Sequence, residues 1–306
     1  MYGSKYNYYY SVYSIIYHPI FCLKKILLLF AVAISLSSCY ENIEGCLDVN
    51  ATNFNVEADR FCEEDCCTYP NLRISVQHFF SETDTTPFFR RDSVYSLNGV
   101  DSFQITDVRY YLSNIKLRDF EGNIFGVEEE LLLFFPTTRD TTTLSIEDNF
   151  VLVDRGVGAT RTIGTTQTNG AFSGIQFDVG LDENARRAAP QFFGSNHPLA
   201  FDDTMMYDLV VNEYIVTQLD LVRDATLAVP DTTRFDILAS EYLENITVNF
   251  DFNIEVGFNS TIALAVDYRK WMEGIDVSND SEILIIEKLK ENIPQSFSLA
   301  EVRASR

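Results

Sequence analysis

Histidine, tryptophan and basic side chains are scarce in this chain of 306 residues. It has three histidines and one tryptophan, and 23 lysines and arginines stand against 45 aspartates and glutamates, for a formal net charge of -22. Such a surface repels the polyanionic backbone of nucleic acid, so we expect no nucleic-acid partner. The acidity serves either solubility outside the cytoplasm or the gathering of cations. A hydrophobic content of 46% argues against disorder and is enough for one large β domain or two smaller domains.

Catalytic motifs are also absent. Gly170–Gly174, GAFSG, has the wrong offset for a nucleophile elbow. The Gly156 and Gly158 pair lacks the third glycine and the following helix of a dinucleotide-binding loop, and no lysine follows as in a phosphate-binding loop. The many carboxylates single out no acid and base pair. The sequence therefore predicts a protein that is not an enzyme.

The longest apolar run near the amino terminus is too short to cross a bilayer. Lys24 and Lys25 precede the eleven-residue run Ile26–Leu36, which has the layout of a secretory signal and cannot span about 30 Å of hydrocarbon. Leu36 to Cys39, LSSC, resembles the bacterial lipobox, which implies that Cys39 is diacylated and becomes the first residue. The alternative is an ordinary signal peptide with an incidental cysteine. We expect an exported protein anchored by lipid to the outer membrane, on its periplasmic or its cell-surface face.

The segment before this signal lacks the charge pattern of a signal peptide and carries seven tyrosines. We interpret residues 1–38 as a miscalled extension followed by a lipoprotein signal peptide, with Leu23 as the true start. Cleavage before Cys39 removes Lys5, Lys24 and Lys25 and no acidic residue, which lowers the formal charge by three, to -25.

The cysteines are few and clustered. Four of the six lie within 22 residues, at Cys46, Cys62, Cys66 and Cys67. In an exported chain this cluster predicts two disulfides with three pairings open, although the adjacent Cys66 and Cys67 cannot easily pair with each other. A zinc site is the alternative, but the spacing is not that of paired CxxC knuckles. We expect residues 39–70 to form the lipid anchor and a disulfide-stapled module.

Residues 46–70 resemble a short cysteine-bounded module of exported bacterial lipoproteins of the Bacteroidetes type. Its short polar side chains suit either Asx turns or an oxygen-ligand calcium loop, and the glycine and closing glutamate of an EF-hand are absent. These side chains are Asp48, Asn50, Asn53, Asn55 and Asp59.

Helical periodicity is rare after Leu72, and period-two alternation replaces it. In ITVNFDFNIEV, residues 246–256, six apolar residues alternate with five polar residues, as in a half-buried antiparallel strand. Weaker runs cover residues 72–79, 103–117, 174–181, 214–222 and 261–268. The last is apolar on both faces, as a central strand would be. The sequence predicts an all-β fold, an antiparallel β-sandwich over residues 71–306.

Three segments depart from the strand pattern. Residues 183–189 predict a short helix stopped by Pro190, and residues 281–292 predict a short C-terminal helix. Residues 298–303 are interpreted as a tail. Residues 156–174 are rich in glycine and threonine and predict a long mobile loop.

The stretch SNHPLAFDDTMMYDL, residues 195–209, sets His197 near two methionines. Imidazole and thioether are ligands that copper prefers, so this stretch is a candidate copper site. Pro198 pushes His197 into an extended conformation. Met205 and Met206 begin a strand and leave on opposite faces, so at most one could join His197, and core filling is the alternative. His78 points inward near the end of its strand, either as a ligand or as a rim histidine bonded to a backbone carbonyl.

Several motifs together resemble the MbnP-like family over residues from about Leu72 to Val302. The first is a Y-Y-L-S-N-I strand at residues 110–115, and the second is a strand ending in G-x-D with a following asparagine. A later H-P-L and M-Y segment and a V-D strand with an amphipathic tail complete the match. The residues that carry these later motifs are Gly180, Asp182, Asn184, His197, Pro198, Leu199, Met206, Tyr207, Tyr214, Val266, Asp267 and residues 283–289.

The resemblance implies an exported β-rich protein that can bind copper, in some members through histidines and a tryptophan oxidised to kynurenine by a diheme peroxidase-like partner. Asp208 and Val210 replace the two family tryptophans, and Ile237 stands where a histidine would. Trp271 lies in a different segment, so the modified-tryptophan site is not carried over.

We therefore expect a non-catalytic, lipid-anchored binding protein for copper or a copper-containing ligand, with a residual copper site from His78, His197 and Met206. Its expected partners are the membrane and a diheme peroxidase-like protein or an outer-membrane receptor. The alternative is a structural or adhesive surface lipoprotein without metal.

Overall fold

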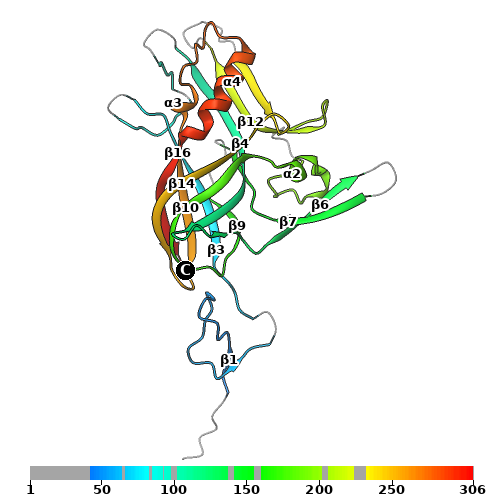
Figure 1. Ribbon diagram of the computed structural model, residues 1–306, viewed down its shortest axis with the longest axis vertical. Helices are drawn as coiled ribbons and strands as arrows, with labels where there is room; N and C mark the ends of the chain where they lie inside the picture. Colours follow the sequence, from blue (N-terminus) through cyan, green and yellow to red (C-terminus); the bar gives the residue numbers. More distant parts are fainter. Residues whose placement is uncertain are drawn as a thin grey trace, which may run out of the picture.

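The computed structural model describes residues 42–63, 66–82, 85–91, 93–97, 102–136, 141–154, 160–201, 206–223 and 232–305. The signal segment, Cys39 and Met205 lie outside these residues. Two β-sheets pack face to face, with short helices above them and a small cysteine-rich module below (Figure 1). The predicted all-β sandwich, with a disulfide-rich N-terminal module and a short C-terminal helix, is confirmed.

The larger sheet is organised around the long strand β4 (Gln104–Asp119), which pairs with β12 over its first half and with β10 over its second half. All pairs in this sheet are antiparallel. Of the remaining strands, β14 pairs with β10, β11 and β13 pair with β12, and β5 and β8 pair with β4 itself. Its other members are β5 (Ile124–Phe125), β8 (Val151–Asp154), β10 (Gly170–Gly180), β11 (Tyr207–Asp208), β12 (Glu213–Val222), β13 (Thr232–Leu238) and β14 (Leu243–Ile254).

The smaller sheet has the order β16 (Phe297–Ser305), β15 (Asn259–Asp267), β3 (Asn71–Phe79), β9 (Arg161–Thr165). β15 runs parallel to β3, whereas the other two pairs are antiparallel. β15 lies between two partners and Ile262, Ala263 and Leu264 are all buried, which confirms the prediction of a central strand there.

The core lies between the two sheets, as the alternation of β14 predicts. Ile246, Val248 and Ile254 are buried, whereas Thr247 and Asn249 between them are exposed. Phe177 of the larger sheet meets Phe297 of the smaller sheet edge-to-face, with ring centroids 5.3 Å apart. The alternation of apolar and polar side chains thus decides which face of the strand points into the core between the sheets.

The helices are short and capped. α2 (Glu183–Arg187) begins at Asp182, whose carboxylate accepts a hydrogen bond from the Ala185 amide at 2.7 Å, and the 3-10 turn η2 (Pro190–Phe192) follows. α4 (Glu282–Asn292) begins at Ser281 and is followed by η3 (Ile293–Ser296), while α3 (Tyr268–Trp271) follows β15 directly. None of the helices in the described ranges is long and apolar enough to span a membrane.

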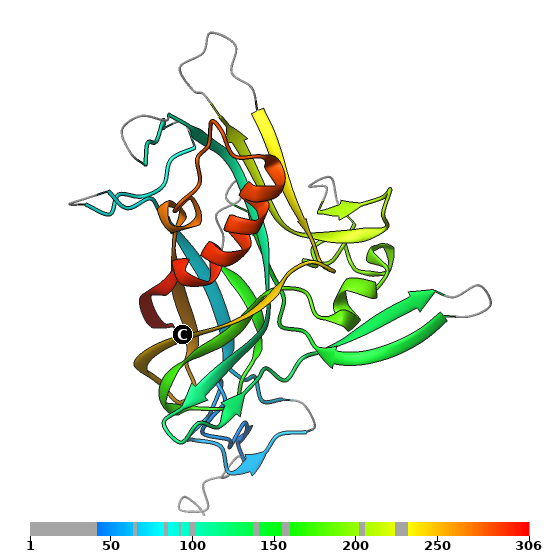
Figure 2. The ribbon, with the colours of Figure 1, turned by 45° about the horizontal axis from the view of Figure 1, so that its top comes forward.

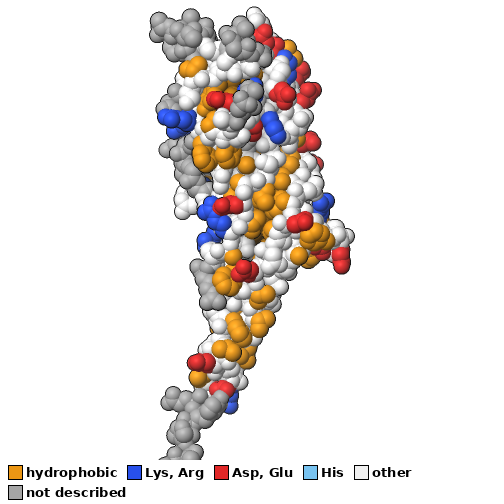
Figure 3. Space-filling view, turned by 90° about the vertical axis from the view of Figure 1, so that its left-hand side faces the viewer, with side chains coloured by type: hydrophobic (Ala, Val, Ile, Leu, Met, Phe, Trp, Pro, Cys, Tyr) orange, Lys and Arg blue, Asp and Glu red, His pale blue; other side chains and the backbone are white. Residues whose placement is uncertain are grey.

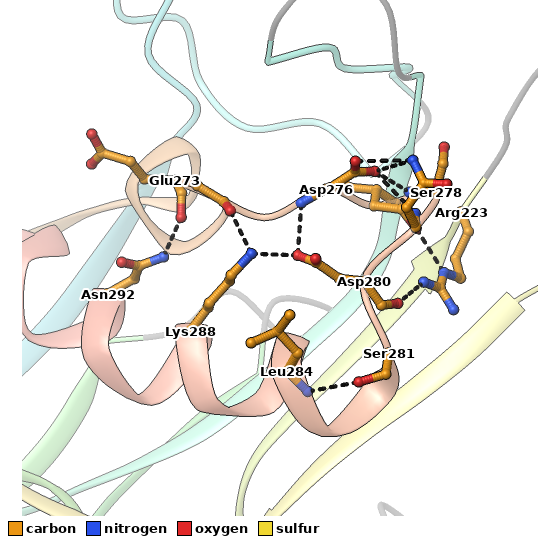
Figure 4. A network of polar contacts seen from close by, with 12 residues as sticks. Arg223, Glu273, Asp276, Ser278, Asp280, Ser281, Leu284, Lys288 and Asn292 are labelled. Atoms are coloured by element: carbon orange, nitrogen blue, oxygen red, sulfur yellow. Dashed lines mark hydrogen bonds and ion pairs between the residues drawn. The ribbon is translucent and has the colours of Figure 1, made fainter.

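A network of polar contacts ties the α3–α4 connection to the end of β12 (Figure 4). The guanidinium of Arg223 donates to the carbonyl oxygens of Val277 at 2.8 Å and Asp280 at 2.6 Å. Lys288 of α4 donates to the Asp280 carboxylate at 2.5 Å and to the Gly274 carbonyl at 2.7 Å. The hydrogen bond from Lys288 holds the pKa of Asp280 below its usual value.

Two predictions for the smaller sheet are wrong. The predicted mobile loop at 156–174 contains β9 and the start of β10, because residues 161–165 pair with β3 and bury Ile163. Residues 156–159 of that loop lie outside the described ranges. The predicted tail at 298–303 is part of β16, because pairing with β15 gives its backbone groups partners and places Phe297 and Leu299 against the core.

A hairpin made by β6 (Glu130–Pro136) and β7 (Thr141–Glu147) projects from the sandwich (Figure 1). Its paired residues Leu131 and Ile146 pack against the core at the base. Sequence periodicity did not predict this hairpin.

The N-terminal module contains β1 (Glu44–Gly45) and β2 (Arg60–Phe61) and two disulfides, as predicted. Cys46 pairs with Cys67 and Cys62 pairs with Cys66, with Cα–Cα distances of 5.1 and 6.0 Å. These bonds decide the pairing that the sequence leaves open.

The Asx side chains of the module form local hydrogen bonds. Asp48 accepts from the Asn50 amide and Asn55 accepts from the Glu57 amide, both at 2.9 Å, which are the geometries of Asx turns. The module contacts the sandwich through a hydrogen bond from Asn169 to Asn50 at 2.8 Å. Hydrophobic side chains lie at its surface, which forms the narrow lower end of the molecule in Figure 3.

Candidate functional site

A bulge in the middle of β4 shapes the candidate site. Pairing between β4 and β10 shifts register between Gln176 and Asp178, and Asn114 opposite this shift has a φ of 51°. Asparagine is among the residues that adopt this left-handed region most readily. Its side chain donates to Asp178 at 3.0 Å, and its backbone amide donates to the Asn149 side chain at 3.1 Å. The local twist therefore depends on asparagine at this position.

Side chains near the bulge connect motifs that lie far apart in the sequence. The Ser113 hydroxyl donates to the Gly180 carbonyl at 2.8 Å, and the Tyr111 hydroxyl donates to the Pro198 carbonyl at 3.0 Å. The Tyr214 hydroxyl donates to the Leu199 carbonyl at 2.8 Å. Burial raises the pKa of Tyr214, so this hydroxyl stays protonated and remains a donor. We call the residues 110–115, 180–184, 197–199 and 206–214 that meet here the motif cluster.

His197 lies in this cluster, between two turns. Its amide donates to the Gly194 carbonyl at 2.8 Å, and its carbonyl accepts from the Ala200 amide at 2.9 Å. Its Nδ1 accepts from the Leu199 amide at 3.1 Å, so in the neutral ring the proton lies on Nε2. Nε2 then donates to the Asp148 carboxylate at 3.0 Å. Both ring nitrogens of His197 are thus oriented by defined partners.

Two pockets adjoin this pair. His197 and Asp148 line the first, of about 270 Å³, together with Glu129 and Arg161. Phe150 separates it from a second pocket of about 240 Å³, which is lined by residues of the motif cluster and of the β7–β8 connection. The lining of the second pocket includes Ser113, Asn114, Lys116, Glu147, Asn149 and Asp182. The site therefore presents carboxylates, amides and one imidazole beside the bulge in the middle of β4.

His78 lies elsewhere, near the end of β3. Its Nδ1 and the Tyr268 hydroxyl are 2.7 Å apart, and the two rings stack with centroids 5.7 Å apart. The sequence alternative was a histidine bonded to a backbone carbonyl, whereas in the structure a tyrosine hydroxyl lies at Nδ1. Its backbone carbonyl accepts from the Phe89 amide at 2.9 Å.

Met206 is buried within the hydrophobic core, with 4% of its surface exposed. The strand that was predicted to begin at Met205 and Met206 begins at Tyr207. The position of Met206 agrees with the core-filling alternative.

His78 and His197, two of the three predicted copper ligands, have different hydrogen-bond partners and different neighbouring rings. Within the described ranges, no group of three or more His, Cys, Asp or Glu side chains is arranged to hold a metal ion. The donor pair that does exist, the His197 imidazole and the Asp148 carboxylate, is a nitrogen and oxygen set. Such a set suits Cu(II) better than Cu(I), which prefers thioether and thiolate ligands.

Sequence reasoning missed Asp148. It lies 49 residues before His197 and is one of 45 acidic residues, so nothing in the sequence marks it. Only the β7–β8 connection, which places Asp148 and Asn149 beside the motif cluster, identifies it.

The fold and the motif cluster define a β-sandwich domain with a polar site beside the bulge of β4 in its larger sheet. A family model described as MbnP matches residues 69–287, and the chain belongs to the MbnP family.

Among solved structures, MbnP from Methylosinus trichosporium is similar to this chain, at 13% sequence identity and a TM-score of 0.41. The similarity covers 78% of this chain and 98% of that chain. No curated protein matches the sequence.

Proposed function

We propose that this chain is a non-catalytic, exported binding protein of the MbnP family, held at the outer membrane by acyl chains on Cys39. Its ligand is copper or a copper-containing compound, and His197 with Asp148 forms the point of attachment. Membership of the family supports this proposal, together with the imidazole and carboxylate pair at the first pocket.

The observation that carries the proposal is the geometry of that pair. Nε2 of His197 and Oδ1 of Asp148 are 3.0 Å apart, and their side chains are 15% and 32% exposed. A Cu(II) ion that replaces the Nε2 proton would find a carboxylate beside it. Glu129 adds a second negative charge to the pocket, against the one positive charge of Arg161. Two protein donors leave coordination positions for donors that the ligand brings, which favours a copper-containing compound over a fully protein-bound ion.

Metal titration tests the proposal. Full-length protein with Cys39→Ser would be titrated with Cu(II) and with Cu(I), and bound metal would be measured after gel filtration. We expect one Cu(II) per chain, a loss of at least tenfold in affinity in His197→Ala and Asp148→Asn, and little change in His78→Ala. The histidine at position 78 is the matched control, since it is also a partly buried imidazole in the sandwich. Absence of stoichiometric uptake, or equal uptake by His197→Ala, would contradict the copper proposal.

Lipid anchoring has a separate test. Cells that express the full chain would incorporate labelled palmitate into the protein and retain it in the membrane fraction, whereas Cys39→Ser would release it. Retention of the serine variant in the membrane fraction, without label in either form, would contradict acylation of Cys39.

A diheme peroxidase-like protein or an outer-membrane receptor is the expected partner, and a copper-dependent pull-down would identify it.

The second candidate function is a structural or adhesive surface lipoprotein without metal. The exposed apolar side chains of the module favour it, because Val56 and Phe61 are 82% and 57% exposed. A chain that takes up no copper but adheres to surfaces through its module would support this alternative.

A further inference from the structure

A third pocket, which shares no lining residue with the two pockets beside Phe150, lies beside α2. It has a volume of about 560 Å³, about twice that of either pocket beside Phe150, and falls in the range of small-molecule sites. In both ribbon views α2 lies between the β6–β7 hairpin and the β11–β12 hairpin (Figures 1 and 2). Each of these three elements contributes lining residues, and we call the space between them the α2 pocket.

The charge of the α2 pocket differs in sign from that of the whole chain. The charged residues of its lining are Arg186, Arg187 and Glu213, whereas acidic residues outnumber basic ones about two to one in the sequence. Both Glu213 oxygens accept from Ser240, one from its amide and one from its hydroxyl at 3.0 Å. The lining therefore offers two positive groups against one carboxylate that already has other partners.

The two guanidinium groups retain hydrogen-bonding capacity. The nearest nitrogen of Arg186 lies 3.7 Å from Glu213, and that of Arg187 lies 3.6 Å from Glu183. Both distances exceed those of charged hydrogen bonds, and each guanidinium carries five N–H donors in a planar fork. Among the described residues, neither guanidinium makes a closer polar contact. A planar oxyanion such as a carboxylate matches this donor geometry.

Apolar groups flank the arginines. Phe135 and Tyr207 line the α2 pocket, and Asn212 and Glu213 at its edge continue directly into the tip of the β11–β12 hairpin. The tip residues Leu209, Val210 and Val211 are 70%, 93% and 53% exposed. Turns of this kind usually carry polar residues, so three consecutive exposed aliphatic side chains are unusual.

The walls of the pocket are fixed by backbone contacts. The Ala189 amide donates to the Phe134 carbonyl of β6 at 3.0 Å, which joins the end of α2 to the β6–β7 hairpin. Asp208 accepts from the Val210 amide at 2.7 Å and from the Val211 amide at 3.2 Å, which holds the hairpin tip in one conformation. The arginines and the aliphatic tip are thus positioned before any ligand binds.

We propose that the α2 pocket binds a carboxylate attached to an aliphatic chain. Arg186 and Arg187 hold the carboxylate, and the chain lies toward Phe135, Tyr207 and the Leu209–Val211 tip. This site does not depend on copper and uses none of the residues of the His197 pair.

Binding of decanoate, the sodium salt of a ten-carbon acid, tests the proposal in the full chain with Cys39→Ser. Calorimetry should give one decanoate per chain, with acetate and decanol each binding at least about tenfold more weakly, because one lacks the chain and the other lacks the charge. Arg186→Gln with Arg187→Gln should weaken decanoate at least about tenfold, and Val210→Ser about threefold. Arg303→Gln and Ile283→Ser are matched controls, since both side chains are exposed and distant in sequence from the pocket, and they should change affinity less than twofold.

Three results would overturn the proposal. They are no decanoate binding at millimolar concentration, equal binding of decanol, and affinity unchanged by the arginine substitutions. Circular dichroism would confirm that each variant is folded. If the double variant is unfolded, Arg187→Gln alone decides the question, because this side chain is 64% exposed. Binding of vesicles that contain anionic lipid, without binding of decanoate, would identify a membrane-docking surface and would likewise overturn the pocket.

Discussion

At the scale of single residues, the Asn114 side chain helps to shape a site whose residues lie far apart in the sequence. It adopts a φ of 51° in the middle of a 16-residue strand and bonds both Asp178 and Asn149. Its neighbour Asn149 adjoins Asp148, the partner of His197. Asp148 and Asn149, two consecutive residues of the β7–β8 connection, therefore join the bulge at Asn114 to His197.

Substitution of Asn114 should separate backbone strain from side-chain bonding. Asn114→Ala loses the hydrogen bond to Asp178 and places there a residue that adopts the left-handed region less readily than asparagine, so we expect a loss of about 2 to 3 kcal/mol in the free energy of unfolding. Asn114→Gly tolerates that backbone and should lose about 1 kcal/mol. Urea denaturation followed by the fluorescence of Trp271, the single tryptophan, measures both. Equal destabilisation by alanine and glycine would show that strain at this position is unimportant.

The candidate site illustrates what the sequence predicts at this scale. His197 was identified because histidines are few and because it lies beside Pro198 in a family motif. Asp148 and Asn149 carry no such mark, since the pairing of β8 with β4 alone places them there. His78 and Met206 are chemically suitable copper ligands, but a strand pattern gives the face of a residue and not its neighbours on other elements.

At the scale of elements, the α3–α4 connection shows how polar groups attach a half-exposed helix to a sheet. Lys288 lies on α4, Asp280 precedes that helix and Arg223 directly follows β12, so one network joins α4, the α3–α4 connection and the end of β12 (Figure 4). The depressed pKa values of Asp276 and Asp280 couple this attachment to pH.

The attachment should weaken in acid. The folded-state pKa of Asp280 lies below its usual value of 3.8, so its stabilising contribution is fully present above that value and is lost as pH falls through the lower, folded-state pKa. Hydrogen exchange of the α4 amides should therefore accelerate relative to β15 amides below about pH 4. Asp280→Asn should make α4 exchange faster at neutral pH and remove most of this difference. An α4 exchange rate that keeps a constant ratio to β15 across the acid range would contradict this role.

Some strands could be predicted from the sequence and others could not. The strand around Ile246–Ile254 was predicted from side-chain alternation, and the strand around Ile262–Val266 from an apolar run on both of its faces. β9 and β16 were missed because Arg161–Thr165 and the region of Phe297 become strands only when β3 and β15 offer them edges to pair with. Tertiary pairing overrides weak local preference in both cases.

At the scale of the whole molecule, a two-sheet sandwich bears a cysteine-rich module at one end (Figures 1 and 2). Residues of the larger sheet and its connections line the two candidate sites. The module is too small to bury a core of its own, so its disulfides should supply much of its stability. The hydrogen bond from Asn169 to Asn50 then attaches a stiff module to the sandwich.

The two disulfides should contribute unequally. The Cys46–Cys67 bond closes a separation of 21 residues and the Cys62–Cys66 bond closes one of 4. Chain entropy predicts losses of about 3 and about 2 kcal/mol when each pair is replaced by serine. Hydrogen exchange should show the loss in residues 42–69, while exchange in β14 and β15 stays unchanged. Acceleration throughout the sandwich would mean that the module and the sandwich unfold as one cooperative unit.

The central claim is that the motif cluster forms the binding site, with copper attached at His197 and Asp148. Paramagnetic broadening by substoichiometric Cu(II), recorded on backbone amide resonances of the isotope-labelled Cys39→Ser chain, tests it most directly. The account predicts selective loss of the amide signals of Asp148, Asn149, Asn196 and Leu199, with the signals of Phe79 and Tyr268 beside His78 retained. Broadening centred on His78, or spread evenly over the acidic surface, would contradict it.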